Sequence, residues 1–464
     1  MMQEAYTIVT ALFYRSLTIL ISIALTCLVA PLSVASEPSL PAGLSLEEED
    51  RGKDALPAAM ETSLPFDLSG FWELRAGMRT QNDPHEKDMS IGETRLQFEM
   101  EKNWENATIR VTSDLVYDPV LDEHDVNIER GEGFFDLREA SLLLRPADFM
   151  DIKVGRQVLT WGTGDLLFIN DLFPKDWNSF FIGRDDENLK APADTVRLSF
   201  FAEVANLDVV YAPRFDADHF IDGRRISYYN STLDSRSGSD TTLHIDRPDD
   251  CFEDYELHLR LYRNLRGYEL NIYGYRGFWK SPAGMDLATE RATFPELSVY
   301  GGSLRGQLLK GIAHIELGYY DSEEDRDGDD HLVRNGEFRF LVGYEQEISR
   351  DFTAGLQYYL ENMLDYHDYK HTLPASVPRK DKNRQVITLR LTRLLMNQNL
   401  TLSFFAYYSP TDDDAYLRPK VNYKIDDRWT AEIGGNVFLG EEDYTFFGQF
   451  EKNNNIYMGL RYGF

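Results

Sequence analysis

From Gly70 onward, apolar and polar side chains alternate along successive segments of the chain. The first segment, 71–80, sets Trp72, Leu74, Ala76 and Met78 against Glu73, Arg75, Gly77 and Arg79. The last sets Ile456, Met458, Leu460, Tyr462 and Phe464 against Tyr457, Gly459, Arg461 and Gly463. Because successive side chains of a strand point to opposite faces, each segment predicts a strand with one apolar and one polar face.

The length of these segments separates two kinds of β protein. A soluble β-sandwich also alternates, but its strands are nearer to about 5–6 residues and its polar face looks outward. The segments here run to about ten residues, which is enough for a tilted strand to cross a bilayer. Large charged residues on the polar face then require a water-filled lumen. The pattern predicts an all-β fold, a transmembrane antiparallel β-barrel.

The connections between the segments support a barrel and orient it. Short joints near 102–105, 145–148, 309–310, 348–351 and 426–427 alternate strictly with long polar ones near 118–133, 162–192, 212–253, 279–295, 321–335 and 362–384. Outer-membrane barrels have short periplasmic turns and long outer loops. The alternation therefore assigns the long connections to the cell exterior.

The strand count depends on the segment before the last strand. A first count finds about nineteen strands, although bacterial single-chain barrels have even strand numbers. Phe446, Phe447 and Phe450 fall at helical rather than strand spacing. We therefore interpret 439–455 as the last outer loop, with a helical turn. This leaves about 18 strands, with about 16 as the alternative.

The N-terminal residues are typical of an export signal. Arg15 precedes an apolar stretch that ends before Ser33-Val34-Ala35, small residues at the positions that signal peptidase reads. We expect a signal peptide over 1–35; a membrane anchor that is retained is the alternative. Residues 36–68 hold four prolines and an acidic cluster, which predicts a loosely ordered periplasmic leader before a barrel over 69–464.

Charge and cysteine content exclude two classes of function. The chain has 48 basic against 78 acidic side chains and a formal net charge of -30. Nucleic-acid binding needs a basic footprint, so no nucleic-acid partner is expected. Two cysteines allow neither a disulfide scaffold nor a CxxC-type zinc site.

Catalytic and metal-binding motifs are weak. His258 and His314 lie in predicted strands beside glutamates, but no nucleophile motif accompanies them. We expect no catalytic residues and no cofactor. The acidic segment 321–330 resembles an EF-hand loop, yet Arg334 stands where the bidentate glutamate is required. We therefore interpret this segment as a solvated acidic outer loop. Such a loop could still bind divalent ions weakly at a lipopolysaccharide surface.

The polar faces of the strands predict the lining of the pore. They place the following charged side chains in the lumen: Arg75, Arg95, Arg110, Arg197, Arg260, Arg339, Arg390, Arg418, Glu73, Glu256, Glu316 and Glu337. Arginine rings favour anions. A nearly balanced set also fits a lattice of ion pairs that stiffens the wall, and this is the favoured interpretation.

The long connection 162–192 is unusually apolar for an outer loop. Its large side chains include Phe168, Phe173, Trp177, Phe180 and Phe181. Because such a loop is unfavourable in water, we expect it to fold into the lumen and narrow the pore, touching wall residues such as Arg110, Arg260 or Arg339. Docking on a partner protein is the alternative.

Two stretches resemble known outer-membrane proteins. The terminal aromatic strand 455–464, which ends in Phe464, resembles the C-terminal assembly signal of Gram-negative outer-membrane proteins. The run 154–162, followed by 170–174, resembles porin-type barrels related to alginate-export proteins. The resemblance implies a barrel fold, a multi-pass outer-membrane location in lipid and lipopolysaccharide, and recognition of the C-terminal strand by the barrel-assembly machinery.

Together these features predict a porin-like channel that passes small hydrophilic solutes by diffusion through a constriction at 162–192. An export or scaffold barrel working with a periplasmic or surface partner is the alternative, with 36–68 as its docking segment. The enzyme interpretation is rejected.

The mature protein should begin at Ser36, because the small residues Ser33 and Ala35 follow the apolar run directly. N-terminal sequencing of the protein from outer-membrane fractions would measure this. Recovery of a mature chain that still carries residues before Ala35 would contradict cleavage at that site.

Overall fold

The computed structural model describes residues 66–464 except 123, 232 and 376. The predicted signal peptide 1–35 and nearly all of the leader 36–68 lie outside the described residues and stay predictions. The first strand, β1 (Asp67–Arg79), begins two residues before the predicted start of the barrel. No described helix is long and apolar enough to span a membrane.

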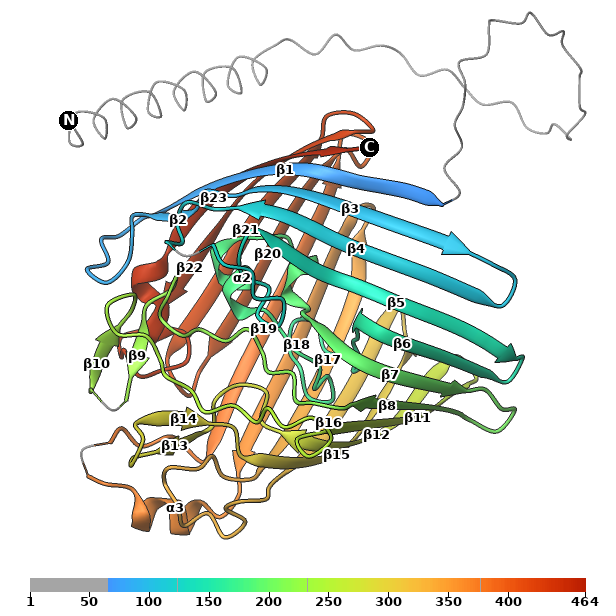
Figure 1. The fold of residues 1–464 in the computed structure, drawn as a ribbon. Helices are drawn as coiled ribbons and strands as arrows, with labels where there is room; N and C mark the ends of the chain where they lie inside the picture. The colour runs from blue at the N-terminus through green and yellow to red at the C-terminus, as the bar shows by residue number, and fades with distance from the viewer. Residues whose placement is uncertain (1–65, 123, 232, 376) are drawn as a thin grey trace, which may run out of the picture. The chain divides into compact units, whose positions relative to one another are not determined.

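Eighteen antiparallel strands form a closed barrel, as predicted. After β1, the wall strands are β3 (Thr94–Asn103), β4 (Ala107–Tyr117), β5 (Phe135–Ala147), β6 (Met150–Val158), β7 (Pro192–Phe200), β8 (Asn206–Ala212), β11 (Glu256–Leu265), β12 (Tyr268–Phe278), β15 (Glu296–Leu308), β16 (Gly311–Ser322), β17 (Glu337–Ser349), β18 (Phe352–Met363), β19 (Asn383–Leu395), β20 (Leu400–Ser409), β21 (Asp414–Lys424), β22 (Trp429–Leu439) and β23 (Asn455–Gly463). Each pairs with the next in sequence, and β1 pairs with β23 in a register from Phe71↔Gly463 to Arg79↔Asn455 (Figure 1).

Smaller elements occupy the long connections. They are β2 (Met89–Ile91), α2 (Trp177–Ile182), η1 (Asp186–Leu189), β9 (Tyr228–Asn230), β10 (Ser235–Ser237), β13 (Gly284–Asp286), β14 (Arg291–Thr293), α3 (Tyr366–Thr372) and η2 (Gly448–Asn453). The segment 439–455 holds the 3-10 helix η2 rather than a wall strand, which confirms the interpretation of this segment as a loop with a helical turn.

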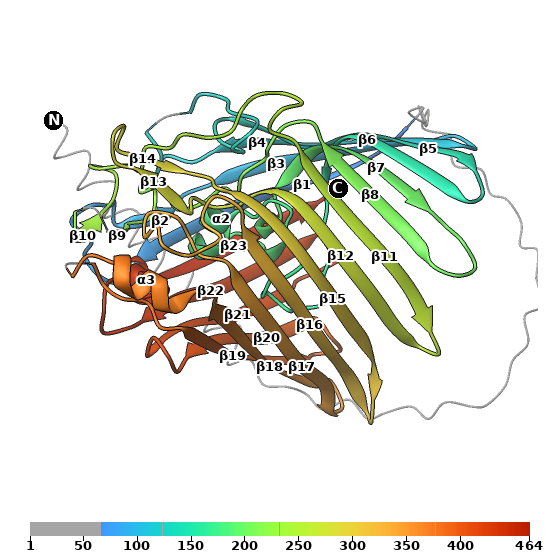
Figure 2. The ribbon, with the colours of Figure 1, turned by 90° about the horizontal axis from the view of Figure 1, so that it is seen from below.

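The wall strands run between two unlike ends. One end carries short turns such as 266–267 and 309–310, and the other carries β9, β10, β13, β14 and α3 (Figure 2). Gly267 has a φ of 85° in its turn, where only glycine is unstrained, and its N–H donates to the Asn264 side chain. The prediction that short and long connections alternate strictly was wrong at one place. The connection 410–413 between β20 and β21 lies at the outer end and is short.

The alternation of the strands sorts side chains between the lumen and the outside. On β12, Asn271 and Tyr273 are buried and face inward, while Ile272 between them is 64% exposed. A belt of exposed apolar side chains follows from the same alternation on other strands: Leu259, Leu261, Ile315, Leu317, Val342, Leu356, Leu402, Val421, Ile433 and Ile456. Such a belt matches the lipid-facing surface of a transmembrane barrel.

Deleting Phe464 should reduce the yield of folded barrel. Its N–H and C=O exchange hydrogen bonds of 3.0 and 3.1 Å with Gly70, and its ring contacts Phe98 at 6.3 Å, so the deletion weakens closure at the end of the β1–β23 ladder. Heat-modifiable mobility of outer-membrane fractions on gels measures the yield. Phe464→Tyr, which keeps the backbone bonds and an aromatic ring, is the control. A normal yield from the deletion would contradict this role.

Candidate channel and its lumen loop

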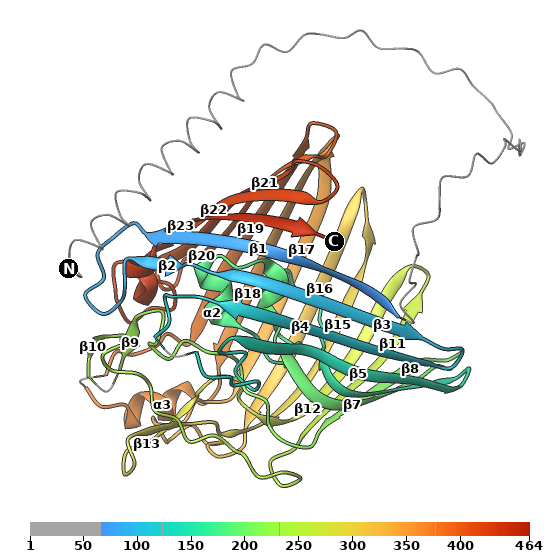
Figure 3. The same ribbon diagram turned by 45° about the horizontal axis from the view of Figure 1, so that its top comes forward.

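The connection between β6 and β7, 159–191, lies inside the barrel, and we call it the lumen loop. Its short helix α2 begins after Asp176, whose carboxylate accepts the N–H of Ser179 at 2.8 Å. The helix ends at Gly183, which has a φ of 88°. A Cβ there would lie 2.2 Å from the ring of Tyr457 on β23, so glycine is needed for conformation and for close approach. Figures 1 and 3 show α2 enclosed by wall strands.

The lumen loop reaches the wall opposite its own base. Its parent strand β6 is the fifth wall strand in order, and β19, the fourteenth, lies half-way around the ring of eighteen. From β19, Arg390 Nη2 lies 2.7 Å from the Asp165 carboxylate. From β21, Arg418 Nη2 lies 2.7 Å from Asp186. The loop therefore crosses the lumen and is held at its far side by ion pairs.

Further hydrogen bonds tie the loop to neighbouring wall strands. The Tyr407 hydroxyl on β20 donates to the Leu166 carbonyl at 2.9 Å. Arg75 Nη1 on β1 donates to the Gly183 carbonyl at 2.7 Å. Anchors on β1, β19, β20 and β21 leave the middle of the loop little freedom to swing out of the lumen.

Glu316 on β16 anchors the first turn of the lumen loop. Its side chain is 0% exposed and accepts the backbone N–H of Thr163 at 2.6 Å and that of Asn170 at 2.8 Å. The Thr163 hydroxyl and the Asn170 side-chain amide donate to it at 2.9 Å each. One buried carboxylate thus accepts the backbone N–H groups at both ends of a turn that has no regular secondary structure.

Aromatic packing completes the attachment. Phe181 on α2 contacts the rings of Tyr416, Phe438 and Phe450 at centroid distances of 5.4, 5.2 and 4.9 Å. Phe180 is also buried, and the guanidinium of Arg418 lies 3.9 Å from its ring centroid. The loop therefore shares one apolar core with the wall on the β21–β23 side.

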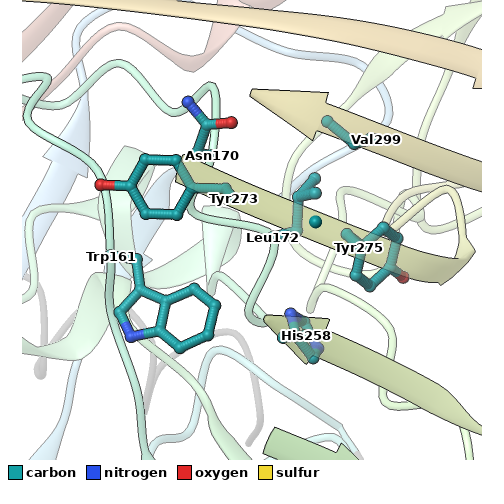
Figure 4. A pocket seen from close by; sticks show the side chains of 8 residues that line it. Trp161, Asn170, Leu172, His258, Tyr273, Tyr275 and Val299 are labelled. Atoms are coloured by element: carbon teal, nitrogen blue, oxygen red, sulfur yellow. The ribbon is translucent and has the colours of Figure 1, made fainter. Parts of the chain in front are cut away.

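A second aromatic contact forms near the start of the loop. The ring of Phe173 stacks on His258 of β11 at 4.3 Å and meets Trp161 at 5.1 Å. Figure 4 shows Trp161, His258 and Tyr273 around Leu172. Phe168 and Trp177 are only partly buried and lie 6.1 Å apart. The five aromatic residues predicted for the loop therefore divide into three buried in wall contacts and two that keep an exposed part.

The arginines that contact the loop differ from the three that we expected. Arg110 pairs with Glu101 and Arg260 with Glu269, both on the wall itself. Arg339 pairs with Glu337 and lies over the ring of Tyr320. The prediction named the wrong arginines for the contact with the loop. Strand alternation shows which face a side chain lies on, but it does not show the height of the side chain or its position around the barrel.

Ion pairs also account for most other charges predicted to line the pore. Arg75 lies 2.8 Å from Glu73 and 2.9 Å from Glu432, and Arg95 pairs with Glu93 and Asp114. Glu256 lies 2.6 Å from Lys280. Arg197 is half-buried on the inward face of β7. This pattern favours the lattice of ion pairs over a ladder of free arginines.

Sequence reasoning missed a second inward segment, 213–227, which follows β8. Asp218 in this segment accepts the N–H of Lys175 at 2.8 Å and the indole N–H of Trp177 at 3.1 Å, so it holds the lumen loop from the outer side. Arg225 is buried and pairs with Asp118. The available signal was the apolar pair Phe215 and Phe220 among closely spaced aspartates.

Two titratable groups in this region respond to their surroundings. Burial, together with the nearby Glu256 carboxylate, raises the pKa of Asp216 to about 6. Burial opposes the charge on His219, yet the Asp176 carboxylate, 3.6 Å from Nδ1, raises the pKa of His219 overall. Asp216 therefore changes charge in weakly acidic solution, while the contact between the two inward segments pairs His219 with Asp176.

A cavity of about 200 Å³ lies between the second inward segment and the neighbouring outer loops. It is lined by Asn127, Glu129, Arg130, Ala217, Asp218, His219, Phe220, Ile245 and Arg247. Arg247 pairs with Glu129 and Arg130 pairs with Asp222. The two guanidinium groups that line the cavity therefore already have carboxylate partners. Within the described residues, no three His, Cys, Asp or Glu side chains converge as a metal site.

Comparison with known proteins gives a likeness in fold. No family model and no curated protein matches the sequence. Among solved structures, Acinetobacter baumannii OccAB3 is similar with a TM-score of 0.50 at 11% identity, over 86% of this chain and 98% of that chain. Pseudomonas aeruginosa OccK3 (OpdO) has a TM-score of 0.50 at 9% identity, over 86% and 96%. The chain has the fold of a Gram-negative outer-membrane porin-type barrel. Its apolar belt fits that membrane.

Glu316→Ala should loosen the first turn of the lumen loop. It leaves the N–H groups of Thr163 and Asn170 without their acceptor, and a hydrogen bond to a charged group is worth about 1.5–3 kcal/mol. Trypsin cleavage after Lys175, Arg184 or Lys190 in the folded barrel should accelerate by about tenfold to a hundredfold.

Mass spectrometry of the fragments measures this cleavage. Glu269→Ala is the matched control, because that glutamate pairs with Arg260 on the wall and is partly exposed. Equal cleavage rates in the two variants would show that Glu316 does not hold the loop.

Proposed function

We propose that this protein is an outer-membrane porin-like channel that passes small hydrophilic solutes by diffusion, with the lumen loop as its constriction. The observation that carries the proposal is the course of the loop, which leaves the wall at β6 and is ion-paired to Arg390 and Arg418 on the opposite side. A loop that spans the aperture in this way leaves solutes only the space beside it.

The chemistry of the lumen beyond the loop supports the choice of hydrophilic solutes. Toward the short turns, the inward-facing side chains of Glu99, Arg305 and Gln307 are exposed, in contrast to the buried Glu316 and Glu73 nearer the loop. Charged groups that are in contact with water inside a barrel are typical of an aqueous channel. This half of the lumen is therefore suited to hydrated solutes.

The alternative function, an export or scaffold barrel, rests on the leader 36–68 as a docking segment. That segment lies almost wholly outside the described residues, so no contact in the barrel bears on it. The buried state of Phe173, Phe180 and Phe181 argues against the loop as a docking surface for an external partner.

The double variant Asp165→Asn/Asp186→Asn should increase single-channel conductance. It removes the carboxylates that pair with Arg390 and Arg418, and each partly exposed pair is worth up to about 1 kcal/mol. A loss of about 1–2 kcal/mol would raise the population of displaced loop by a factor of about 5–30. Planar-bilayer recordings measure the mean conductance and its fluctuations.

Asp427→Asn is the control, because its partner Lys424 lies beside it at a short turn. Reversal potentials in a salt gradient would also change, since the variant frees two arginines in the aperture. Unchanged conductance and selectivity in the double variant would contradict a constriction at the lumen loop. Absence of any channel activity in the wild-type protein would contradict the porin-like function itself.

A further inference from the structure

Two histidines on α3 bring their ring nitrogens together at the outer surface. His367 and His371 are one helical turn apart, and their Nε2 atoms lie 3.2 Å from each other. Both side chains are exposed. The helix lies in the long connection between β18 and β19, at the end of the barrel that carries the long loops (Figure 1).

The separation of the two nitrogens suits one shared metal ion. Imidazole nitrogens bind Zn²⁺ at about 2.0–2.1 Å. Two such ligands lie about 2.9 Å apart at a right angle around the ion and about 3.4 Å apart in a tetrahedron. The observed 3.2 Å lies between these values. Residues four apart on a helix share a face, so the backbone holds the pair in place.

The neighbouring carboxylate orients one of the rings. Asp368 Oδ1 lies 3.3 Å from Nδ1 of His367. An Nδ1–H that donates to this carboxylate leaves the lone pair on Nε2, which is the atom directed at His371. A carboxylate behind a histidine ligand is a common feature of metal sites, because it fixes the ring and raises its basicity.

Charged groups of both signs lie near the pair. The Lys370 ammonium lies over the Tyr366 ring at 5.1 Å, which holds it by a cation–π contact. Gly328, from the acidic segment 321–330, lies against Asp365 at the start of α3. A concentration of negative charge raises the local concentration of cations.

The helix that carries the pair is firmly attached. Tyr369 is 6% exposed, and its hydroxyl accepts the N–H of Lys380 at 3.2 Å. Asn335 donates to the carbonyl of Leu364 at 3.3 Å, just before the helix. Ligands on a rigid support lose less entropy when they bind an ion.

We propose that His367 and His371 form a surface site for one divalent transition-metal ion, with water in the remaining coordination positions. Imidazole ligands suit Cu²⁺, Ni²⁺ and Zn²⁺, whereas Ca²⁺ and Mg²⁺ prefer oxygen. By the general order of divalent affinities, Cu²⁺ binds most tightly. The site is independent of the proposed channel function, since α3 lies outside the lumen loop and its anchors.

Titration of the full mature protein with Cu²⁺ tests this site. The protein is purified in detergent without a histidine tag, and binding is followed by calorimetry and electron paramagnetic resonance. We expect coordination by two imidazole nitrogens, which His367→Ala and His371→Ala each abolish. Asp368→Asn should weaken binding by about tenfold or more. In large excess, Zn²⁺ and Ni²⁺ should compete with Cu²⁺, whereas Ca²⁺ should not.

His244→Ala is the matched control, because His244 is exposed on another outer loop. Heat-modifiable mobility shows that each variant contains a folded barrel. The proposal is overturned if the double variant His367→Ala/His371→Ala binds Cu²⁺ as the wild type does. It is also overturned if His244→Ala removes as much binding, or if Ca²⁺ competes as well as Zn²⁺.

Discussion

In the hydrocarbon of a bilayer, each backbone N–H and C=O must find its hydrogen-bond partner within the protein. The ladder between β1 and β23 meets this constraint, because it joins the first and last strands and leaves no open edge in the wall. Every other feature depends on this closure. The apolar belt has a continuous surface to cover, and the lumen becomes a separate space in which buried charges can be paired.

The lumen loop shows how a polar wall can hold an apolar segment. Its aromatic residues pack against Tyr416, Phe438 and Phe450, while its backbone is satisfied by Glu316, Arg75 and Tyr407. The buried carboxylates and guanidinium groups are therefore committed to structure. A charge that is paired inside the wall contributes little to the field along the path, so selectivity depends more on the groups beside the loop than on the number of arginines.

The two ends of the barrel differ in the length and course of their connections. The short turns are compact, with Gly267 at a φ of 85° in one of them, and they leave the lumen open to water. The long connections fold inward at 159–191 and 213–227 and carry α3 and two small hairpins on the outside. The histidine pair of α3 lies at this end, where residues are free of the period of two that a strand imposes.

The strands of the wall could be predicted from the sequence. Along 72–78 and 257–261 the alternation separates a lipid-facing from a lumen-facing side, because burial in lipid and contact with water select opposite faces. The sequence also predicted that Phe173, Phe180 and Phe181 would be buried. Which arginines meet the lumen loop depends on the tertiary structure. Arg390 lies 225 positions from Asp165, and Arg418 lies 232 positions from Asp186. Their height and place around the ring depend on the stagger of all strands together. The inward course of 213–227, and the formation of the short helix that brings His367 to His371, likewise depend on the tertiary structure, because long connections have no repeating pattern from which their course can be inferred.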